Sequence, residues 1–155
     1  MMNIPLLSIC IPTYNRSGYL VQTLDSFIKS KGFDSRVEIV ISDNCSTDDT
    51  ENICREYSNK YDNIKYYKQP NPTDIADKNF ADALSLGTGI YLKLSNDTLP
   101  FKSDTLEFML DKITQNINNK IPLFFHPLYN TPHIKETEAE VNSIDELVSN
   151  ISYGI

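Results

Sequence analysis

The chain has 155 residues, of which 40% are hydrophobic and 23% are charged, and its formal net charge is -7. A globule of this length buries roughly 70% of the surface of its unfolded chain, so one domain with a proper core is expected. The excess of acidic residues argues against nonspecific binding to nucleic acids or to anionic membranes, because both need clustered Lys and Arg. If the ligand is anionic, we expect a metal ion to mediate its binding.

Targeting and cysteine patterns favour a cytoplasmic protein. No positively charged N-terminal region precedes a long apolar stretch, and no run of about 18 apolar residues occurs, so neither a signal peptide nor a membrane span is predicted. The three cysteines, Cys10, Cys45 and Cys54, show neither Cys-x-x-Cys nor Cys/His ligand spacing. This pattern suits a reducing compartment, and we expect all three to be structural or inert.

The first predicted unit is a strand followed by an amphipathic helix. Residues 6–11 form a short run rich in apolar residues that stops at Pro12, as expected for a buried parallel strand. From Ser17 onward apolar residues recur at helical spacing, and Lys31 with Gly32 gives a basic last turn and a C-terminal stop. The apolar residues of this helix are Leu20, Leu24, Phe27 and Ile28.

The alternation of strand and helix continues along the chain. Residues 37–41 are β-branched and apolar, which predicts a second strand. Ser46, with Asp49 in the place that Glu usually takes, indicates a capping box that opens a helix to about Lys60. Residues 64–67 are predicted to form a third strand.

Two further strands and two further helices are predicted before the tail. A helix over residues 77–86 is ended by Gly87 and precedes a fourth strand over residues 90–94. Ser103 is expected to cap the next helix, and residues 123–125 are predicted to form a fifth strand. The buried stripe of the helix after Ser103 consists of Leu106, Met109, Leu110, Ile113 and Ile117.

Strands that alternate with helices predict an α/β fold, a mainly parallel sheet with helices on both faces. We expect a single domain over residues 1–155, with a ligand-binding core over 1–120. Residues 121–155 are a polar tail with a weak helix over 143–149, and they leave the architecture incomplete. Ligands bind beyond the carboxyl ends of the strands in such sheets, so the loops after strands one, two and four are the candidate site.

The first loop, Pro12-Thr13-Tyr14-Asn15-Arg16, contains no glycine pattern of the kind that cradles phosphate in dinucleotide-binding or P-loop sites. It offers an aromatic face, amide and hydroxyl groups and one guanidinium. These groups are suited to holding a base by stacking and hydrogen bonds while Arg16 contacts a phosphate. The alternative is an ordinary strand-to-helix turn in which Asn15 or Ser17 caps the helix.

The second loop, residues 42–48, places Asp43 directly at a strand end. Its carboxylate could accept a hydrogen bond from a base N–H or a ribose hydroxyl. Asp48 and Asp49 are interpreted as first-turn residues of the following helix, where the helix dipole favours a negative charge.

The fourth strand ends in Ser95-Asn96-Asp97-Thr98. Asp97 could give one carboxylate to a hard divalent cation such as Mg²⁺, with diphosphate oxygens and water in the remaining positions. The alternative is an exposed turn before Pro100.

Together the three loops resemble the successive signatures of family 2 glycosyltransferases. The similar segments are Ser8-Ile-Cys-Ile-Pro-Thr-Tyr-Asn-Arg16, Ile41-Ser-Asp-Asn-Cys-Ser-Thr-Asp48 and Tyr91-Leu-Lys-Leu-Ser-Asn-Asp97. Asp77-Lys78-Asn79-Phe80 also resembles the Asp-x-Asn-Phe segment of some capsule and O-antigen transferases. The likeness covers roughly residues 6–115, and the order and spacing of the segments agree with the family.

The resemblance implies a GT-A fold, a nucleotide-diphosphate sugar donor, commonly UDP-linked, and an Mg²⁺ or Mn²⁺ ion at the Asp-x-Asp motif. Asp97 would be the metal-binding carboxylate of that motif. Ser95 stands where its first Asp is expected, and a hydroxyl does not supply the missing negative charge. The residues implied to bind the nucleotide are Pro12, Thr13, Tyr14, Asn15, Arg16, Asp43, Lys78 and Asn96.

The resemblance also implies transfer with inversion, in which a carboxylate base takes a proton from an acceptor hydroxyl and the metal stabilises charge on the leaving diphosphate. Residues 1–120 would be the donor-binding core and 121–155 the start of the acceptor-side region. The acceptor would be a saccharide or a lipid-linked saccharide, with peripheral membrane association an option for the complete enzyme. No motif singles out the base. The tail offers the carboxylates Glu136, Glu138, Glu140, Asp145 and Glu146, whereas His126 and His133 lack ligand-spaced partners.

Two functions remain open on the sequence. The first is an active sugar transferase with its base in the tail or in a segment supplied by another chain. The second is a truncated or degenerate domain that binds a nucleotide, or only a partner, without turnover, and Ser95 with the end at Ile155 favours it. A nucleotidyltransferase of similar architecture would normally carry a Gly-rich basic loop after the first strand, which residues 12–16 are not.

Overall fold

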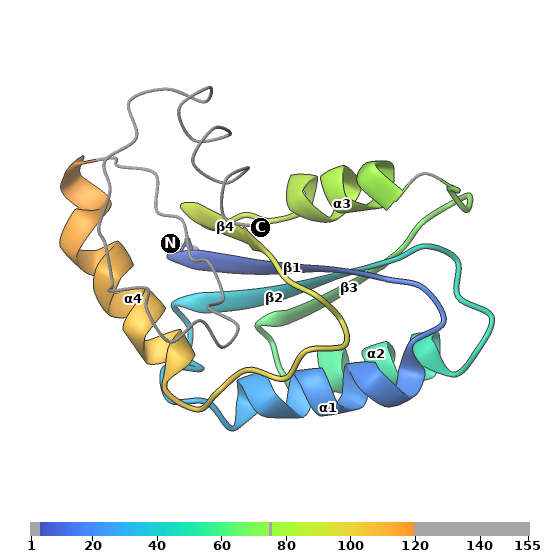
Figure 1. Ribbon diagram of the computed structural model, residues 1–155, viewed down its shortest axis with the longest axis horizontal. Helices are drawn as coiled ribbons and strands as arrows, with labels where there is room; N and C mark the ends of the chain where they lie inside the picture. Colours follow the sequence, from blue (N-terminus) through green and yellow to red (C-terminus); the bar gives the residue numbers. More distant parts are fainter. Residues whose placement is uncertain (1–3, 75, 120–155) are drawn as a thin grey trace, which may run out of the picture. The chain divides into compact units, whose positions relative to one another are not determined.

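The computed structural model describes residues 4–74 and 76–119, which form strands and helices in alternation (Figure 1). The strands are β1 (Leu7–Thr13), β2 (Val37–Asp43), β3 (Ile64–Lys68) and β4 (Tyr91–Leu94). The helices are α1 (Ser17–Ile28), α2 (Thr50–Lys60), α3 (Ala76–Ser85) and α4 (Thr105–Asn116), followed by a short 3-10 helix, η1 (Ile117–Asn119). The strand predicted over 123–125 and the helix predicted over 143–149 lie outside the described residues.

The four strands form a parallel sheet with the order β3-β2-β1-β4. β1 and β2 stay paired to their ends, where Thr13 lies opposite Asp43. β4 ends earlier, and its last pair joins Leu94 to Cys10. The chain proceeds outward from β1 to β3 and then returns to add β4 on the other side of β1. This reversal of strand order makes the carboxyl end of β1 the switch point at which α/β sheets bind ligands.

The two central strands need cover on both faces. Every residue of β1 and β2 is buried, as is typical of continuous parallel strands. α1 and α2 lie on one face of the sheet and α3 lies on the other (Figure 1). Ala83 of α3 packs against Cys10 and Val40. The buried residues of α1 are Leu20, Thr23, Leu24 and Phe27. The predicted mainly parallel sheet with helices on both faces is therefore confirmed.

α4 is held by an apolar stripe and by a close approach to the turn after α1. Its stripe of Leu106, Met109, Leu110 and Ile113 is buried, as the helical spacing predicts. Gly32 has a φ of 87°, and a Cβ there would lie 3.3 Å from the backbone of Glu107. Glycine alone tolerates both the left-handed conformation and this approach. The N-cap residue of α4 is Asp104, so the prediction that Ser103 caps this helix was wrong.

β1 is longer than predicted and continues through Pro12 to Thr13. The carbonyl of Cys10 accepts a hydrogen bond from the Ser95 N–H, at the point where β1 and β4 part. Two residues later the backbone of Pro12 faces the same side of β1, toward β4, but β4 has already ended at Leu94. The missing N–H of proline therefore removes no bond from the sheet.

α2 begins at Thr50, four residues later than the predicted start at Ser46. The N–H and the hydroxyl of Ser46 both donate to Asp43 Oδ1, so Ser46 closes a turn after β2 instead of capping the helix. Asp49 is the N-cap residue and makes no side-chain cap bond. The short-range pattern of a capping box is thus used for a different turn.

Candidate functional site

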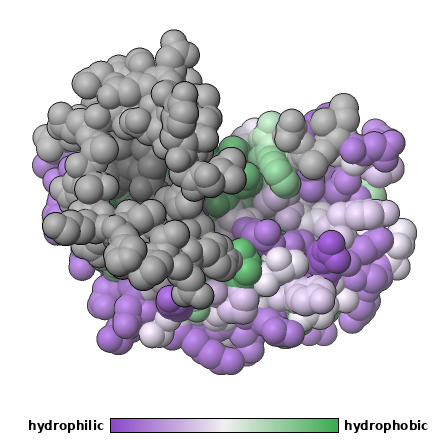
Figure 2. Space-filling view, viewed as in Figure 1, coloured by the Kyte–Doolittle hydropathy of each residue, from purple (hydrophilic) through white to green (hydrophobic). Residues whose placement is uncertain are grey.

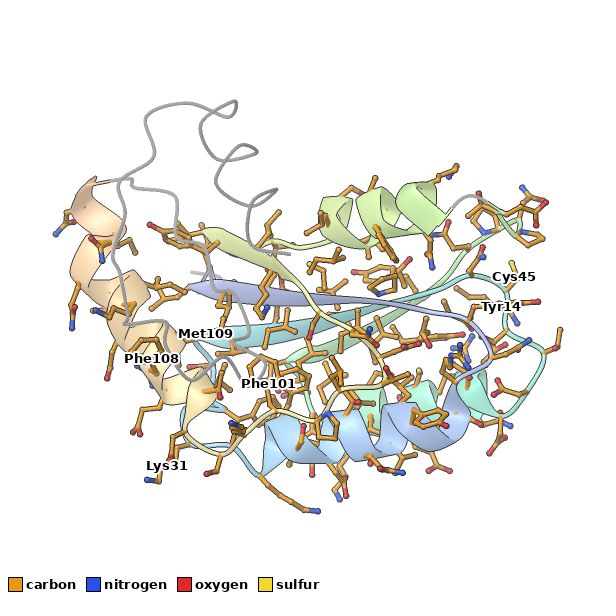
Figure 3. All side chains as sticks on the ribbon, viewed as in Figure 1. Tyr14, Lys31, Cys45, Phe101, Phe108 and Met109 are labelled. Atoms are coloured by element: carbon orange, nitrogen blue, oxygen red, sulfur yellow. The ribbon has the colours of Figure 1, made fainter. Side chains whose placement is uncertain are left out.

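The loops that follow β1, β2 and β4 meet at the carboxyl edge of the sheet, as the parallel topology requires. Tyr14 of the first loop and Cys45 of the second lie at this same end (Figure 3). Figure 2 shows mainly hydrophilic residues over this end of the described part. The three predicted loops therefore contribute to one polar edge.

The Asp97 carboxylate at this edge is oriented by residues of β1 and α1. Thr13 Oγ1 donates to Asp97 Oδ2 at 2.8 Å, and Thr23 Oγ1 donates to the backbone carbonyl of Asp97 at 2.9 Å. Burial raises the pKa of Asp97 above its usual 3.8, and the Thr13 hydrogen bond and the Arg16 charge oppose the rise. A partly desolvated carboxylate gains more from a bound cation than an exposed one does.

Arg16 is an exposed cation whose charge acts on this carboxylate. Its backbone N–H donates to Thr50 Oγ1 at 3.3 Å, which ties the first loop to the start of α2. The guanidinium makes no hydrogen bond or ion pair with residues 4–74 or 76–119. An exposed guanidinium in this position is chemically suited to a phosphate.

Tyr14 is the exposed aromatic residue of the first loop, with 51% of its surface accessible. An accessible ring of this kind offers a face to a base, and stacking of a base on an aromatic side chain contributes about 1–3 kcal/mol. Tyr14 and Arg16 flank Asn15, so the conformation of Asn15 determines how both side chains leave the loop.

Asn15 uses its side chain to hold the second loop. Its Oδ1 accepts hydrogen bonds from the backbone N–H groups of Thr47, at 2.8 Å, and Asp48, at 3.3 Å. Its own N–H donates to Ser46 Oγ at 2.9 Å, and its φ is 51°. Asn is among the few non-glycine residues that adopt this left-handed conformation readily. The predicted nucleotide contact of Asn15 stays a prediction, because its oxygen already has two partners in the protein.

Asp43 is fully buried at the end of β2. Its Oδ1 accepts from the Ser46 N–H at 2.8 Å and from Ser46 Oγ at 2.5 Å. Its Oδ2 accepts from the Tyr66 hydroxyl at 2.7 Å. The predicted contact of Asp43 with a base stays a prediction, whereas its bonds within the protein support the loop.

The loop after β3 is also fastened to this edge, which the sequence did not indicate. Asn44 Nδ2 donates to the Thr73 carbonyl at 2.8 Å, and Asn44 Oδ1 accepts from the Thr73 N–H at 2.7 Å. Gln69 Nε2 donates to Ser42 Oγ at 2.9 Å. Sequence reasoning missed the linking roles of Asn44, Gln69, Ser46 and Tyr66. The signal that could have indicated them is the density of Asn and Ser after β2, since such residues often bond to nearby backbone.

The remaining predicted site residues have local partners. Pro12 is buried within β1. Lys78 Nζ forms an ion pair with Asp82 one turn along α3, at 2.7 Å. Asn96 Oδ1 accepts from the N–H and the hydroxyl of Thr98, which closes a compact turn around Asp97. The structure thus brings one set of predicted residues to the same edge: Thr13, Tyr14, Asn15, Arg16, Asp43 and Asp97. Among residues 4–74 and 76–119, no side-chain hydrogen bond joins Lys78 or Asn96 to these residues.

The family model "Glycosyl transferase family 2" matches residues 8–144, a span that includes all of these loops. The chain belongs to glycosyltransferase family 2. The abequosyltransferase RfbV of Salmonella typhimurium is 36% identical to it over 104 residues, which cover 67% of this chain and 31% of RfbV. The chain therefore spans about a third of the length of this relative.

Solved structures of family members place the chain in the GT-A fold. TarS of S. aureus in complex with UDP is 27% identical, with a TM-score of 0.65 over 72% of this chain and 32% of that chain. TarS in complex with UDP-GlcNAc is 26% identical to this chain, with a TM-score of 0.63. A mannosyltransferase of Pyrobaculum calidifontis, solved with GDP-Man and Mn²⁺, is 20% identical with a TM-score of 0.59 over 67% of this chain and 31% of that chain. At that identity the likeness shows the fold alone.

Transferases of the GT-A fold commonly use a divalent metal. The residues at the carboxyl edge of the sheet are therefore compared with the ligands that such a cation needs. Within the described part of the chain, no three His, Cys, Asp or Glu residues gather to hold a metal ion. Asp97 supplies one carboxylate, already oriented by Thr13. This arrangement fits a hard cation that takes its other ligands from a diphosphate and water. Among the described helices, none is both long and apolar enough to cross a membrane.

Proposed function

We propose that this chain forms the donor-binding part of an inverting glycosyltransferase that takes a sugar from a nucleotide-diphosphate donor, UDP-linked, and transfers it to an acceptor hydroxyl. The observation that carries the proposal is the oriented Asp97 carboxylate, which lies within the field of the exposed Arg16 guanidinium at the switch point of the sheet. UDP and UDP-GlcNAc in the TarS complexes support a uridine donor.

Each residue of the edge has a proposed task. Tyr14 stacks on the base, and Arg16 binds a phosphate of the donor. Asp97, together with the donor diphosphate, holds Mg²⁺ or Mn²⁺, which when bound supplies positive charge opposite the leaving diphosphate. Thr13 keeps the Asp97 carboxylate in place through its hydroxyl. The residues proposed to complete the nucleotide pocket are Pro12, Asn15, Asp43, Lys78 and Asn96.

We infer that the acceptor is a saccharide or a lipid-linked saccharide, and that the general base comes from outside residues 4–119. The base must take a proton from the acceptor hydroxyl on the side of the sugar opposite the diphosphate, because the reaction inverts. The resemblance to the family implies that the acceptor side follows the donor-binding segment along the chain. Residues 121–155, or a further segment, would therefore start the acceptor side.

The test is nucleotide binding by the whole chain, followed through thermal unfolding with and without Mn²⁺. UDP or UDP-GlcNAc at about 100 times its Kd should add roughly 2.7 kcal/mol of stability and raise the Tm by several degrees. Asp97→Ala should abolish the metal-dependent part of the shift. Asp62→Asn, an exposed carboxylate before β3, is the matched control and should keep the full shift.

Alkylation of Cys45 provides a second readout that does not depend on stability. Cys45 is half-buried in the second loop, whereas Cys10 and Cys54 are buried. Burial raises the pKa of Cys10 to about 11 and that of Cys54 to about 12, so both thiols should resist iodoacetamide in the folded protein. UDP with Mn²⁺ should slow labelling of Cys45. If no nucleotide changes either the Cys45 labelling rate or the Tm, donor binding by this chain is refuted.

A further inference from the structure

The two binding loops are joined by a path of hydrogen bonds that starts outside them, at Tyr66 on β3. The Tyr66 hydroxyl donates to Asp43 Oδ2 at 2.7 Å. Asp43 Oδ1 accepts from the N–H and the hydroxyl of Ser46. Ser46 Oγ in turn accepts from the Asn15 N–H at 2.9 Å. A contiguous path therefore leads from β3, through the second loop, into the first.

The chemistry of the groups fixes the direction of every bond along this path. The hydroxyls of Tyr66 and Ser46 each donate to a carboxylate oxygen of Asp43. The single hydroxyl proton of Ser46 is used there, which leaves its lone pairs for the Asn15 N–H. Burial and the Asp43 hydrogen bond raise the pKa of Tyr66, so the phenol keeps its proton and remains a donor.

The path holds a left-handed backbone conformation in the first loop. Asn15 and Cys45 are non-glycine residues with positive φ, at 51° and 59°. Asn adopts this conformation more readily than most non-glycine residues, and it persists where its surroundings hold it. Asn15 lies between Tyr14 and Arg16. Its φ therefore sets the direction of the proposed base-stacking ring and of the proposed phosphate-binding guanidinium.

We propose that Tyr66 is a positioning residue of the donor site. Acting through Asp43 and Ser46, it holds Asn15 and so sets where Tyr14 and Arg16 stand. This inference rests on the proposed function, and it adds a supporting role to the proposed place of Asp43 in the nucleotide pocket.

Tyr66→Phe removes the first bond of the path, and Tyr57→Phe is its matched control. The Tyr57 hydroxyl donates to Asp25 Oδ1 at 2.8 Å between α2 and α1, so the control loses the same kind of bond away from the loops. The readouts are UDP affinity by calorimetry in the presence of Mn²⁺, and hydrogen exchange over residues 13–17 of the ligand-free chain. Tyr66→Phe should weaken UDP binding roughly tenfold and speed exchange over 13–17. Tyr57→Phe should change neither.

Ser46→Ala interrupts the same path one step later and permits a double-mutant cycle. If Tyr66 acts through Ser46, the double variant should bind UDP no more weakly than Ser46→Ala alone, because both changes break one path. Additive losses would show that Tyr66 acts by another route and would overturn the proposal.

The outcomes separate the two proposals. A wild-type chain that binds no nucleotide refutes the proposed function. Even then, faster exchange over residues 13–17 in Tyr66→Phe but not in Tyr57→Phe supports the conclusion that Tyr66 holds the first loop. A wild-type chain that binds UDP, with Tyr66→Phe equal to it in affinity and exchange, overturns the positioning role. Equal losses in Tyr66→Phe and Tyr57→Phe would reflect general stability and would also overturn it.

Discussion

Asp97 carries its carboxylate in a partly buried position, with a hydrogen bond from Thr13 and the charge of Arg16 acting on it. Burial raises its pKa above the usual 3.8, and these two groups offset the rise only in part. Between the unfolded and folded pKa values the native state binds more protons than the unfolded state does. The contribution of Asp97 to stability therefore falls as the pH rises through that window. Charged residues at functional sites commonly carry such a cost, which agrees with the proposed metal-binding role of Asp97.

Removal of the Asp97 charge should therefore stabilise the ligand-free chain. Asp97→Asn retains an oxygen that can accept from Thr13, and we expect it to raise the Tm by roughly 2 °C at pH 7. The gain should shrink at pH 3, where the wild-type carboxyl is protonated in both states. Calorimetry at the two pH values measures the difference. A lower Tm of the variant at both pH values would contradict the account, since it would mean that the fold needs the charge.

Sequence patterns predicted which polar residues follow the strands but not which partners they have within the protein. The predicted nucleotide contacts of Asn15 and Asp43 stay predictions, and in the structure Asn15 accepts from the second loop while Asp43 accepts from Ser46 and from Tyr66 of β3. A loop motif shows which polar groups are available, whereas their partners depend on segments far along the chain. Tyr66, one strand further on, was out of reach for that reason.

At the scale of helices, Asp48 joins the starts of α1 and α2. Its Oδ2 accepts from the Ser17 N–H at 3.1 Å, and its Oδ1 accepts from the N–H and the hydroxyl of Thr50. Burial opposes ionisation of Asp48, but hydrogen bonds from Thr50 and Ser17 outweigh it and lower its pKa to about 2. One carboxylate thus satisfies free N–H groups at two helix N-termini, where a negative charge is favoured.

Loss of this shared cap should destabilise the fold more than loss of the neighbouring acid. We expect Asp48→Ala to lower the Tm by roughly 5 °C at pH 7, because it uncaps two helices. Asp49→Ala should lower it by less, since Asp49 makes no side-chain cap bond. The contribution of Asp48 is present above its unfolded pKa and is lost as the pH falls toward 2. Equal effects of the two variants in a thermal scan would refute the shared cap.

The order and type of the elements within the described residues followed from hydrophobic pattern, but several ends did not. Buried apolar runs identified the strands, since both faces of a parallel sheet are covered. Pro12 was predicted to end β1, whereas the early end of β4 lets the strand continue. The start of α2 was misplaced because Ser46 bonds back to Asp43. In both cases a contact with another part of the chain, and not the local sequence pattern, determines where the element begins or ends.

At the scale of the whole described unit, the two ends of the sheet serve different purposes. The carboxyl end carries the proposed donor site, whereas the amino end carries a buried network centred on Glu38. Its Oε1 accepts from Ser8 Oγ at 2.6 Å and from the N–H and hydroxyl of Thr88 at 2.6 and 2.8 Å. Ser8 Oγ also accepts from the Gly89 N–H at 2.7 Å. This network fastens β1 and β2 to the turn between α3 and β4.

Breaking the Glu38 network should therefore lower global stability and leave nucleotide affinity unchanged. Glu38→Ala leaves buried donors of Ser8 and Thr88 without an acceptor. The free energy of unfolding should therefore fall by about 3 kcal/mol. Glu38→Gln keeps an acceptor oxygen and should lose less. Burial alone would raise the pKa of Glu38, but hydrogen bonds from Ser8, Thr88 and Gly89 lower it, so its stabilising charge is lost as the pH falls below the usual 4.5.

Urea unfolding measures this effect, and the midpoint should fall without a change in slope. UDP affinity, measured well below the midpoint, should match that of the wild-type chain because the network lies at the opposite end of the strands from Thr13 and Asp97. A loss of affinity in Glu38→Gln that exceeds its loss of stability would show that the two ends are coupled, and the division of the sheet into a structural end and a binding end would then be wrong.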